Sequence, residues 1–414
     1  MNALGLRDIL SALVLMIAVT VTVAAQPATD GGSSRAVRHS GDAVFRELGY
    51  AAALAAAREE QKPLLACFVA AYSLPCKFLD ETTWVEPRVR SLLAERVVAI
   101  RVDVEREAAL AGRFRVDRTP TLLLLDADER ELDCIEGYRT AKLMVDELEG
   151  ALAGRDAETR ARARIEQTRG QDAVARHALA NVLVRKGRET EALEQFEWCF
   201  DQALPRNIVY ASTQRAALFS DWARLAARFA PARDAMQARR AACERVLLEE
   251  RDEANVARNL AGLAQHLGDT EALVEFYDRL KADSRARGVL IDAVFDRLVD
   301  ARRYDDILAE IEPRESFRHR VQVARAGGGL ACCPVHARRG PGTVGSVVER
   351  GARLVEALAA TKRDADARAL IDDVIRFEDT IATRELLVAR LERAERRELA
   401  DRVRGTGQPG ASDR

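Results

Sequence analysis

Cysteine thiols are the groups in this 414-residue chain that are best suited to covalent chemistry. Seven are present, at positions 67, 76, 134, 199, 243, 332 and 333. An odd number leaves at least one without an intramolecular partner, and the irregular spacing implies neither a disulfide scaffold nor a zinc ribbon. The five histidines are scattered, and the sequence has no phosphate-binding loop, zinc-protease motif or serine-hydrolase motif.

One of these cysteines, Cys76, lies where a helix is expected to begin. It follows Ser73 and Pro75, and proline is favoured in the first turn of a helix. The preceding run Leu64–Ala70 is continuously apolar, which is typical of a strand that is buried on both faces of a sheet. The sequence therefore predicts a thiol near the start of a helix, just after a buried strand.

Residues 41–152 have the pattern of an α/β domain. A helix is predicted from Ser40 to about Gln61, where Lys62-Pro63 ends it. The four predicted strands and the closing helix follow at 64–70, 97–104, 121–125, 131–137 and 140–153. Helices alternate with the first strands and a hairpin comes late, so we expect a mixed sheet with helices on its faces.

Five separate signals, in this order, resemble an exported thioredoxin-like domain. They are Lys62-Pro63, Tyr72-Ser73-Leu74-Pro75-Cys76-Lys77, Val102-Asp103-Val104, Thr119-Pro120-Thr121 and Gly137-Tyr138. The resemblance covers about a quarter of the chain and implies the thioredoxin-like fold, whose active site is a W-C-x-x-C motif at the start of a helix. In that family the helix dipole lowers the pKa of the first thiol, and the second thiol resolves the mixed disulfide.

The resemblance also implies roles for the motif residues, and several depart from the family pattern. Ser73 takes the attacking position, where a hydroxyl is not ionised near neutral pH and cannot form a disulfide. Cys76 takes the resolving position, and Tyr72 replaces the tryptophan. We expect Ser73 to be an ordinary helix N-cap. We expect Cys76 to be an inert, half-buried thiol or, alternatively, a monothiol that traps partners.

Two further positions follow from the same resemblance. Cys67 takes the place of a buried acid beneath the resolving thiol. We expect a small core residue there, with two nearby free thiols or a Cys67–Cys76 disulfide as the outcomes to distinguish. Thr119-Pro120 is the cis-proline candidate, which in the family faces the active site and helps to bind an extended substrate backbone. Cys134 is expected to fill the core one strand away from Cys67, beyond disulfide reach.

Residues 155–404 change to helical periodicity. In two segments a first helix ends at a glycine, Gly187 or Gly268, and a second helix reads Glu-Ala-Leu-x-x-Phe. These segments resemble degenerate tetratricopeptide repeats, which implies a solenoid-like array of helix pairs with a concave surface for a protein or peptide. An all-α domain without such a groove is the alternative. We expect few contacts with residues 41–152 and no strand beyond residue 160.

Other residues of the helical region receive structural interpretations. Cys199 and Cys243 lie on apolar helix faces, so both are expected in the core. The charged residues within 221–225 and 239–240 belong to long amphipathic helices and are expected on solvated faces.

The segment 326–351 interrupts the helical pattern. Seven of its residues are glycine and two are proline, which indicates an irregular loop or a local error in the sequence. Cys332, Cys333 and His336 are too crowded to surround one ion, so no metal site is expected. Residues 405–414 are expected to form a disordered polar tail.

Residues 1–25 are expected to form a cleaved signal peptide, with an uncleaved N-terminal membrane anchor as the alternative. Ile9–Val23 is a mostly apolar run that is short for a membrane span, and Val23-Ala24-Ala25 provides a candidate cleavage site. Residues 26–40 follow as a flexible leader. We therefore expect the protein in the periplasm or outside the cell.

Charge and composition narrow the function classes. The chain has 64 basic and 66 acidic residues, and this balance argues against a nucleic-acid partner and against a polybasic membrane surface. Beyond the signal segment, no membrane contact and no cofactor are expected. The apolar fraction of 48% is enough for real cores.

The sequence favours an exported thioredoxin-like protein with a degenerate redox site, which binds or scaffolds a protein or peptide through its helical repeats. The alternative is an enzyme, a thiol–disulfide oxidoreductase or isomerase that acts through the single motif cysteine, Cys76. Ser73 favours the first reading, because a monothiol forms mixed disulfides but cannot release them intramolecularly. The partner's identity does not follow from the sequence.

Overall fold

The computed structural model describes residues 44–249, 254–325 and 343–405. The predicted signal peptide at 1–25 and the leader at 26–40 lie outside these ranges, as do Cys332, Cys333 and His336 and all but the first residue of the predicted tail. Among the helices within the described ranges, none is long and apolar enough to cross a membrane.

Four strands form one mixed sheet at the positions that the sequence predicts. Their order across the sheet is β2-β1-β3-β4, with β1 and β2 parallel and the other two pairs antiparallel. The bounds are β1 Leu64–Val69, β2 Val98–Asp103, β3 Thr121–Leu125 and β4 Glu131–Glu136. The two central strands are apolar except for Thr121 at the start of β3, because both faces of the sheet are covered.

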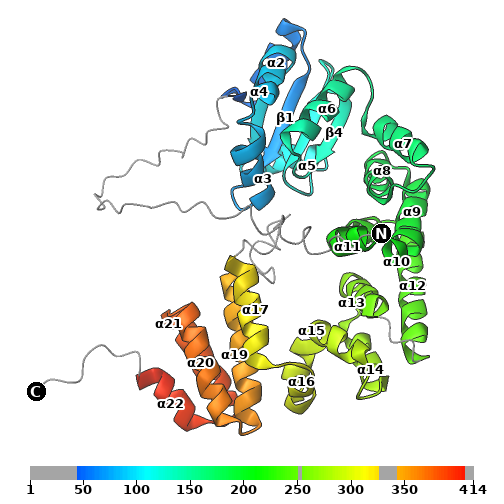
Figure 1. The fold of residues 1–414 in the computed structure, drawn as a ribbon. Helices are drawn as coiled ribbons and strands as arrows, with labels where there is room; N and C mark the ends of the chain where they lie inside the picture. The colour runs from blue at the N-terminus through cyan, green and yellow to red at the C-terminus, as the bar shows by residue number, and fades with distance from the viewer. Residues whose placement is uncertain (1–43, 250–253, 326–342, 406–414) are drawn as a thin grey trace, which may run out of the picture. The chain divides into compact units, whose positions relative to one another are not determined.

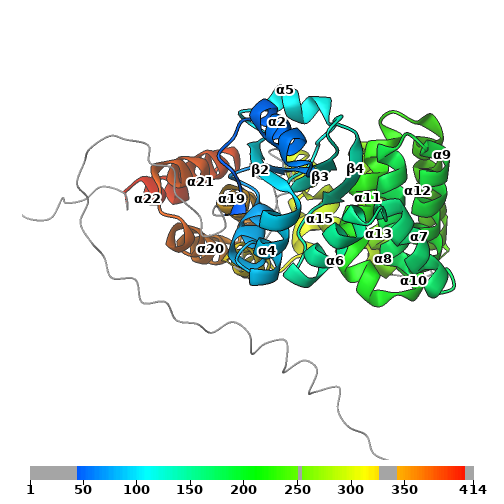
Figure 2. The same cartoon turned by 90° about the horizontal axis from the view of Figure 1, so that it is seen from above.

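Helices cover both faces of this sheet (Figure 2). α2 and α5 pack on one face, and α4 and α6 pack on the other. The bounds are α2 Tyr50–Glu60, α3 Leu74–Phe78, α4 Pro87–Arg96, α5 Ala108–Arg113 and α6 Ala141–Leu152, with a π-helical turn Leu79–Thr83 after α3. Successive side chains of each strand point to opposite faces, so the sheet separates two apolar clusters.

The first helix of this domain is shorter than predicted. It begins at Tyr50, ten residues later than the predicted start at Ser40, which itself lies outside the described residues. Residues 46–49 run beside the sheet, where the backbone N–H of Arg46 donates to the carbonyl oxygen of Ala99 at 2.8 Å. The prediction was wrong because this tertiary hydrogen bond outweighs the local helix propensity of the segment.

The remainder of the described chain is helical, and no strand follows β4 within the described ranges (Figure 1). The first helices are α7 Ala157–Gln167, α8 Ala173–Arg185, α9 Glu189–Trp198, α10 Leu204–Arg206, α11 Ile208–Ala226, α12 Ala230–Leu248, α13 Ala254–Leu267 and α14 Thr270–Arg279, with a π-helical turn Cys199–Ala203. The others are α15 Arg285–Asp300, α16 Tyr304–Glu310, α17 Pro313–Arg325, α19 Val344–Ala360, α20 Asp364–Phe377, α21 Ile381–Arg393 and α22 Arg397–Gly405.

Tight left-handed turns join several successive helices. Gly187 has φ 74° between α8 and α9, and Gly268 has φ 77° between α13 and α14, as the repeat pattern predicts. Arg302 and Lys362 make the corresponding turns later in the chain, with φ 57° and 63°. A residue in this conformation stops one helix and lets the next run back along it.

The predicted irregular loop is shorter than 326–351. α19 begins at Val344, where the Thr343 hydroxyl caps the helix by accepting the backbone N–H of Ser346 at 3.2 Å. Gly351 lies inside this helix, and a Cβ atom there would come within 2.7 Å of Val374 Cγ2. This glycine therefore permits close helix packing rather than a loop, and residues 326–342 lie outside the described ranges.

The buried apolar residues fall into three clusters, two on the faces of the sheet and one that runs through the helical region. Cys199 and Cys243 lie in the helical cluster, as predicted. Long polar side chains join the α/β domain to the helices: Arg160 on α7 contacts Asp133 at 2.8 Å, and Arg185 on α8 contacts Glu131 at 2.7 Å. The apolar cores are separate, but the polar contacts between the two regions are more numerous than the few that the sequence predicts, because Arg118 and Arg224 add further ion pairs.

Candidate functional site

The motif segment forms the start of α3. Ser73 occupies the N-cap position and Pro75 lies in the first turn, so the Cys76 thiol belongs to the first turn of the helix. Ser73 is 2% exposed and Cys76 is 6% exposed, and Tyr72 is half-buried. The thiol is thus more buried than the half-buried side chain that the sequence predicts.

The Ser73 hydroxyl is not an ordinary cap. Within the described chain it makes no hydrogen bond to the backbone of its own helix. Instead it donates to the carbonyl oxygen of Thr119 at 3.1 Å, in a buried contact that joins residues 46 positions apart. The cap prediction was therefore right about the position of Ser73 and wrong about its hydrogen bond. A capping hydroxyl accepts a backbone N–H of its own helix, whereas the Ser73 hydroxyl is oriented to donate to Thr119.

Thr119 and Pro120 form the loop that faces Ser73. The Thr119–Pro120 peptide bond is cis, and both residues are buried. The loop is fixed on its other side by the backbone N–H of Gly137, which donates to the carbonyl oxygen of Pro120 at 2.8 Å. The Thr119 hydroxyl is buried and makes no hydrogen bond of ordinary geometry within the described residues, but it lies close enough to the Cys76 thiol to lower that thiol's pKa.

The surroundings of Cys76 favour the protonated thiol. Burial raises the pKa of this thiol above its usual range. The Ser73 hydroxyl, the backbone at Ala70 and the Thr119 hydroxyl act in the opposite direction but do not compensate. A protonated thiol is a poor nucleophile, so the resting site is not set up for attack on a disulfide.

Cys67 lies fully buried in the middle of β1, on the sheet face covered by α4 and α6. Burial first, and then the nearby Cys76 thiol, raise the pKa of Cys67 far above its usual range. Both cysteines are free thiols in this structure. The structure therefore shows two neighbouring free thiols and not a disulfide, while Cys134 packs toward the opposite face of the sheet.

An ion pair beside Cys67 escaped the sequence analysis. Arg101 on β2 is in register with Cys67, and its Nη1 lies 3.3 Å from Asp80 Oδ2 in the π-helical turn after α3. The guanidinium also stacks over the Phe45 ring, with its central carbon 4.7 Å from the ring centroid. The alternation of β2 could have marked Arg101 as a charge that points inward, because it shares a face of the strand with the buried Ala99.

Two exposed aromatic rings lie beside the motif helix. Phe78 at the end of α3 and Tyr138 after β4 make an edge-to-face contact with their ring centroids 6.1 Å apart. The Tyr138 hydroxyl is 3.1 Å from the Thr82 hydroxyl, which holds the ring in place. Exposed aromatic rings that are fixed in this way are typical of surfaces that bind polypeptides.

Asp221 on α11 is the largest departure from the sequence interpretation. It was expected on a solvated face, but it is 3% exposed and accepts hydrogen bonds from His177 Nε2 at 2.9 Å and Asn181 Nδ2 at 2.7 Å. Its other oxygen is contacted by Arg224 at 3.0 Å and by Arg118.

Arg239 and Arg240, on α12, were also expected on a solvated face. Both form ion pairs and are largely covered, so neither lies on a freely solvated face.

The charge of Asp221 is well compensated. Burial alone would raise the pKa of this carboxyl, but the hydrogen bond from His177 and the charge of Arg118 outweigh it and hold the pKa well below its usual range. Since an ionised carboxylate only accepts hydrogen bonds, His177 Nε2 is the donor. His177 Nδ1 then faces the Tyr210 hydroxyl at 3.2 Å.

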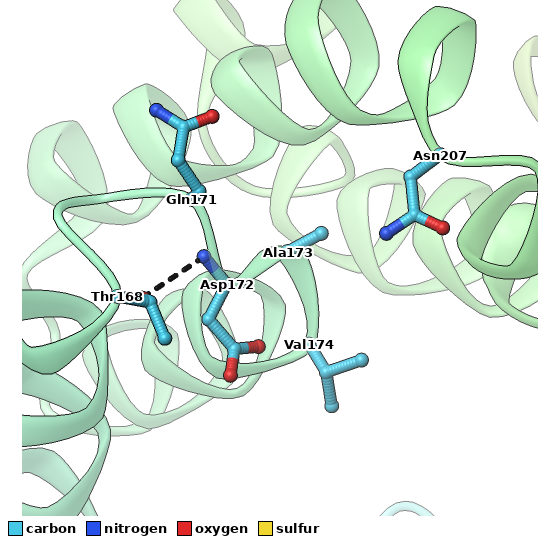
Figure 3. A pocket seen from close by; sticks show the side chains of 6 residues that line it. All are labelled: Thr168, Gln171, Asp172, Ala173, Val174 and Asn207. Atoms are coloured by element: carbon cyan, nitrogen blue, oxygen red, sulfur yellow. Dashed lines mark hydrogen bonds between the residues drawn. The ribbon is translucent and has the colours of Figure 1, made fainter.

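A shallow hollow of about 320 Å³ lies away from these residues, where α8 and α11 begin (Figure 3). It is lined by Thr168, Gln171, Asp172, Ala173, Val174 and Asn207. Asp172 and Asn207 use their side chains to cap the two helices, and the Asp172 carboxylate also pairs with Arg164. The Asp172 and Asn207 side chains are therefore occupied by structural contacts. No cluster of potential metal ligands occurs within the ranges that the structure describes.

The fold and the site together define a thioredoxin-like α/β domain that is followed by a long all-helical region. A family model described as thioredoxin-like matches residues 46–127. Thioredoxin Y1, a chloroplast protein of Arabidopsis thaliana, is 26% identical over 91 residues, and the match covers 22% of this chain and 51% of that protein. The chain thus spans about half the length of this curated relative.

Two solved structures are also similar to the N-terminal part of the chain. An oxidoreductase called DsbH is 17% identical, with 30% of this chain and 95% of that chain covered and a TM-score of 0.25. A thioredoxin from Thermus thermophilus is 26% identical, with 27% of this chain and 90% of that chain covered and a TM-score of 0.26.

Proposed function

We propose that this protein is a thioredoxin-like polypeptide-binding protein that acts outside the cytoplasm and does not turn over disulfides. The observation that carries the proposal is the state of the motif. Ser73 stands in the attacking position with its hydroxyl committed to the Thr119 carbonyl, and the one motif thiol, Cys76, is buried and protonated.

The electron balance supports this view. Reduction of a substrate disulfide takes two electrons, which two thiols supply when they join to form a disulfide. Cys76 alone can form a mixed disulfide with one substrate sulfur, but a second thiol is needed to release the product. Cys67 is the nearest candidate, and its full burial and strongly raised pKa oppose that role.

Polypeptide binding is supported by the features that remain around the motif. The loop at Thr119 and Pro120 keeps the place that the thioredoxin-like resemblance gives to the substrate backbone. Tyr138 follows Gly137, whose backbone N–H donates to the carbonyl oxygen of Pro120, so the Phe78–Tyr138 pair presents an exposed apolar surface near this loop. A partner could therefore bind to this face without any covalent step.

The helical region is proposed to act as a tetratricopeptide-like array that binds a protein or a peptide. Paired helices with left-handed turns at Gly187 and Gly268 support this proposal. Arrays of this kind recognise partners on a continuous surface that several repeats build together. Export through residues 1–25 remains part of the same proposal, on the basis of the apolar run Ile9–Val23.

The decisive test is a disulfide-reduction assay on residues 26–414, with the Cys76→Ser variant as the control. The proposal expects no catalytic turnover above that of the variant. Turnover that depends on Cys76 would overturn it in favour of an oxidoreductase or isomerase. One equivalent of a stable mixed disulfide on Cys76, without turnover, would instead identify the protein as a monothiol that captures partners.

A further inference from the structure

The helical region is attached to the loop of the candidate site by a buried contact at Arg118 and by a more exposed ion pair of Arg224 with Asp117 at 2.6 Å. Arg118 immediately precedes Thr119, and its guanidinium forms an ion pair with Asp221 on α11. The same guanidinium lies 3.6 Å from Glu136 on β4, within the α/β domain. Arg118 is thus held between the two parts of the chain, directly beside the loop that contacts Ser73.

The contact is fixed on its helical side. The Asp221 carboxylate is held by His177 and Asn181 on α8 and by Arg224 on its own helix. A buried carboxylate with several donors is costly to move, because any displacement leaves charged groups without partners. The position of the Arg118 side chain is therefore dictated by α8 and α11.

On the side of the α/β domain, few residues lie between Arg118 and the motif helix. The Arg118 carbonyl oxygen accepts the Thr121 hydroxyl at 2.9 Å, and the Thr119 carbonyl oxygen accepts the Ser73 hydroxyl. Ser73 is three residues before Cys76 in the same helical turn. Only the residues Arg118, Thr119 and Ser73 separate the buried carboxylate of α11 from the turn that carries the thiol.

We infer that Asp221 is a positioning residue for the thioredoxin-like site. Through Arg118 it holds the loop at Thr119 and Pro120 closed over Ser73 and Cys76. The helical region therefore controls how far the motif opens to a polypeptide. The inference deepens the proposed function and rests on it, because it assumes that partners use this loop.

The test compares two buried ion pairs that join the same two parts of the chain. Arg118→Gln breaks the pair with Asp221 together with the longer contact to Glu136. Arg160→Gln breaks the pair between Arg160 on α7 and Asp133, away from the loop. In the full chain, the rate at which iodoacetamide alkylates Cys76 is measured by peptide mapping. Alkylation of Cys199, which is fully buried in the helical cluster, monitors global unfolding in the same sample.

We expect Arg118→Gln to accelerate the alkylation of Cys76 at least about tenfold, with Cys199 unchanged. The variant loses the buried contact, and the exposed Arg224–Asp117 pair that remains holds the loop only weakly. Arg160→Gln should change the Cys76 rate less than about twofold. Arg118→Lys should restore slow alkylation, since a single guanidinium nitrogen makes the contact with Asp221 and an ammonium group can replace it.

An equal acceleration by both Gln variants, an unchanged rate in Arg118→Gln, or a failure of Arg118→Lys to restore slow alkylation would overturn the inference. The measurement is independent of turnover. If the wild-type chain reduces disulfides through Cys76, the proposed function fails, while the alkylation rates still decide whether Asp221 positions the loop.

Discussion

The Ser73 hydroxyl donates to the carbonyl oxygen of Thr119 at 3.1 Å, and both residues are buried. In a thioredoxin-like protein the residue at this position attacks disulfides, whereas here its side chain ties the motif helix to the neighbouring loop. The Ser73 side chain is therefore part of the scaffold of the site.

This hydrogen bond predicts a stability cost for Ser73→Ala. The change leaves the Thr119 carbonyl oxygen buried without this donor, which should cost about 1–2 kcal/mol in the free energy of unfolding. Urea unfolding monitored by circular dichroism measures the change. Ser91→Ala serves as the control, because the Ser91 hydroxyl makes only an exposed contact with Glu95. A cost for Ser73→Ala no greater than that of the control would contradict the prediction.

Ser73→Cys is predicted to rebuild a redox motif. The new thiol would start α3 three residues before Cys76, where the helix N-terminus favours a thiolate. A mild oxidant should then convert the two thiols to a disulfide by taking up two electrons. The reduced variant should in turn reduce a test disulfide. The count of free thiols by mass spectrometry and an insulin-reduction assay measure both effects. The double variant Ser73→Cys, Cys76→Ser should show neither, and a Ser73→Cys variant that keeps both thiols free would show that the backbone of the motif has changed as well.

The lowered pKa of Asp221 predicts that the folded protein loses stability in acid. Its pKa is lowered in the folded chain, so its contribution is present above the unfolded pKa of about 3.9 and is lost as the pH falls below it. Asp221→Asn should cost about 3 kcal/mol at pH 7, and less as the pH falls below about 4. Unfolding midpoints in urea across this pH range give the comparison.

Asp133 provides a control, because its pKa is shifted in the opposite direction and its effect on stability should change with pH in the opposite sense. Burial raises its pKa, although Arg160 and the backbone N–H of Ala157 act against the shift. The stability of the wild-type chain relative to Asp133→Asn should therefore decrease as the pH rises above about 4. Equal pH dependence of the two variants would contradict the assignment of Asp221 as the more strongly stabilised carboxylate.

At two glycines of α19, substitution by alanine is predicted to change the stability of the fold in opposite directions. In Gly351→Ala the new Cβ would lie 2.7 Å from Val374 Cγ2 and 2.8 Å from Phe317 Cε2, and such overpacking costs about 1–3 kcal/mol. Gly345 has no atom within 4 Å of the corresponding position in the described residues, so Gly345→Ala should be neutral or stabilise by about 0.5 kcal/mol. Thermal unfolding midpoints distinguish the two. Similar shifts in both variants would show that α19 and α20 are less closely packed.

Local patterns in the sequence were sufficient to predict the α/β domain. Apolar runs such as Leu64–Val69 indicate buried strands, and Pro75 indicates the start of the motif helix, because these signals depend on near neighbours in the chain. The sequence also shows that the position to which the thioredoxin-like resemblance assigns the attacking thiol carries Ser73, and the chemistry of a hydroxyl does not depend on the fold. Gly187 and Gly268 likewise predict their turns, because φ above 0° is a local preference of glycine.

Only the tertiary structure decided the polar contacts over long distances. Nothing in the helical period of α11 distinguishes Asp221 from a solvated charge, because its partners Arg118 and His177 lie on other elements 103 and 44 residues away. The same reason explains why Ser73 bonds to Thr119 and not to its own helix. A residue's type and spacing determine the chemistry that it can perform, whereas the partners that it meets depend on the packing of the whole chain.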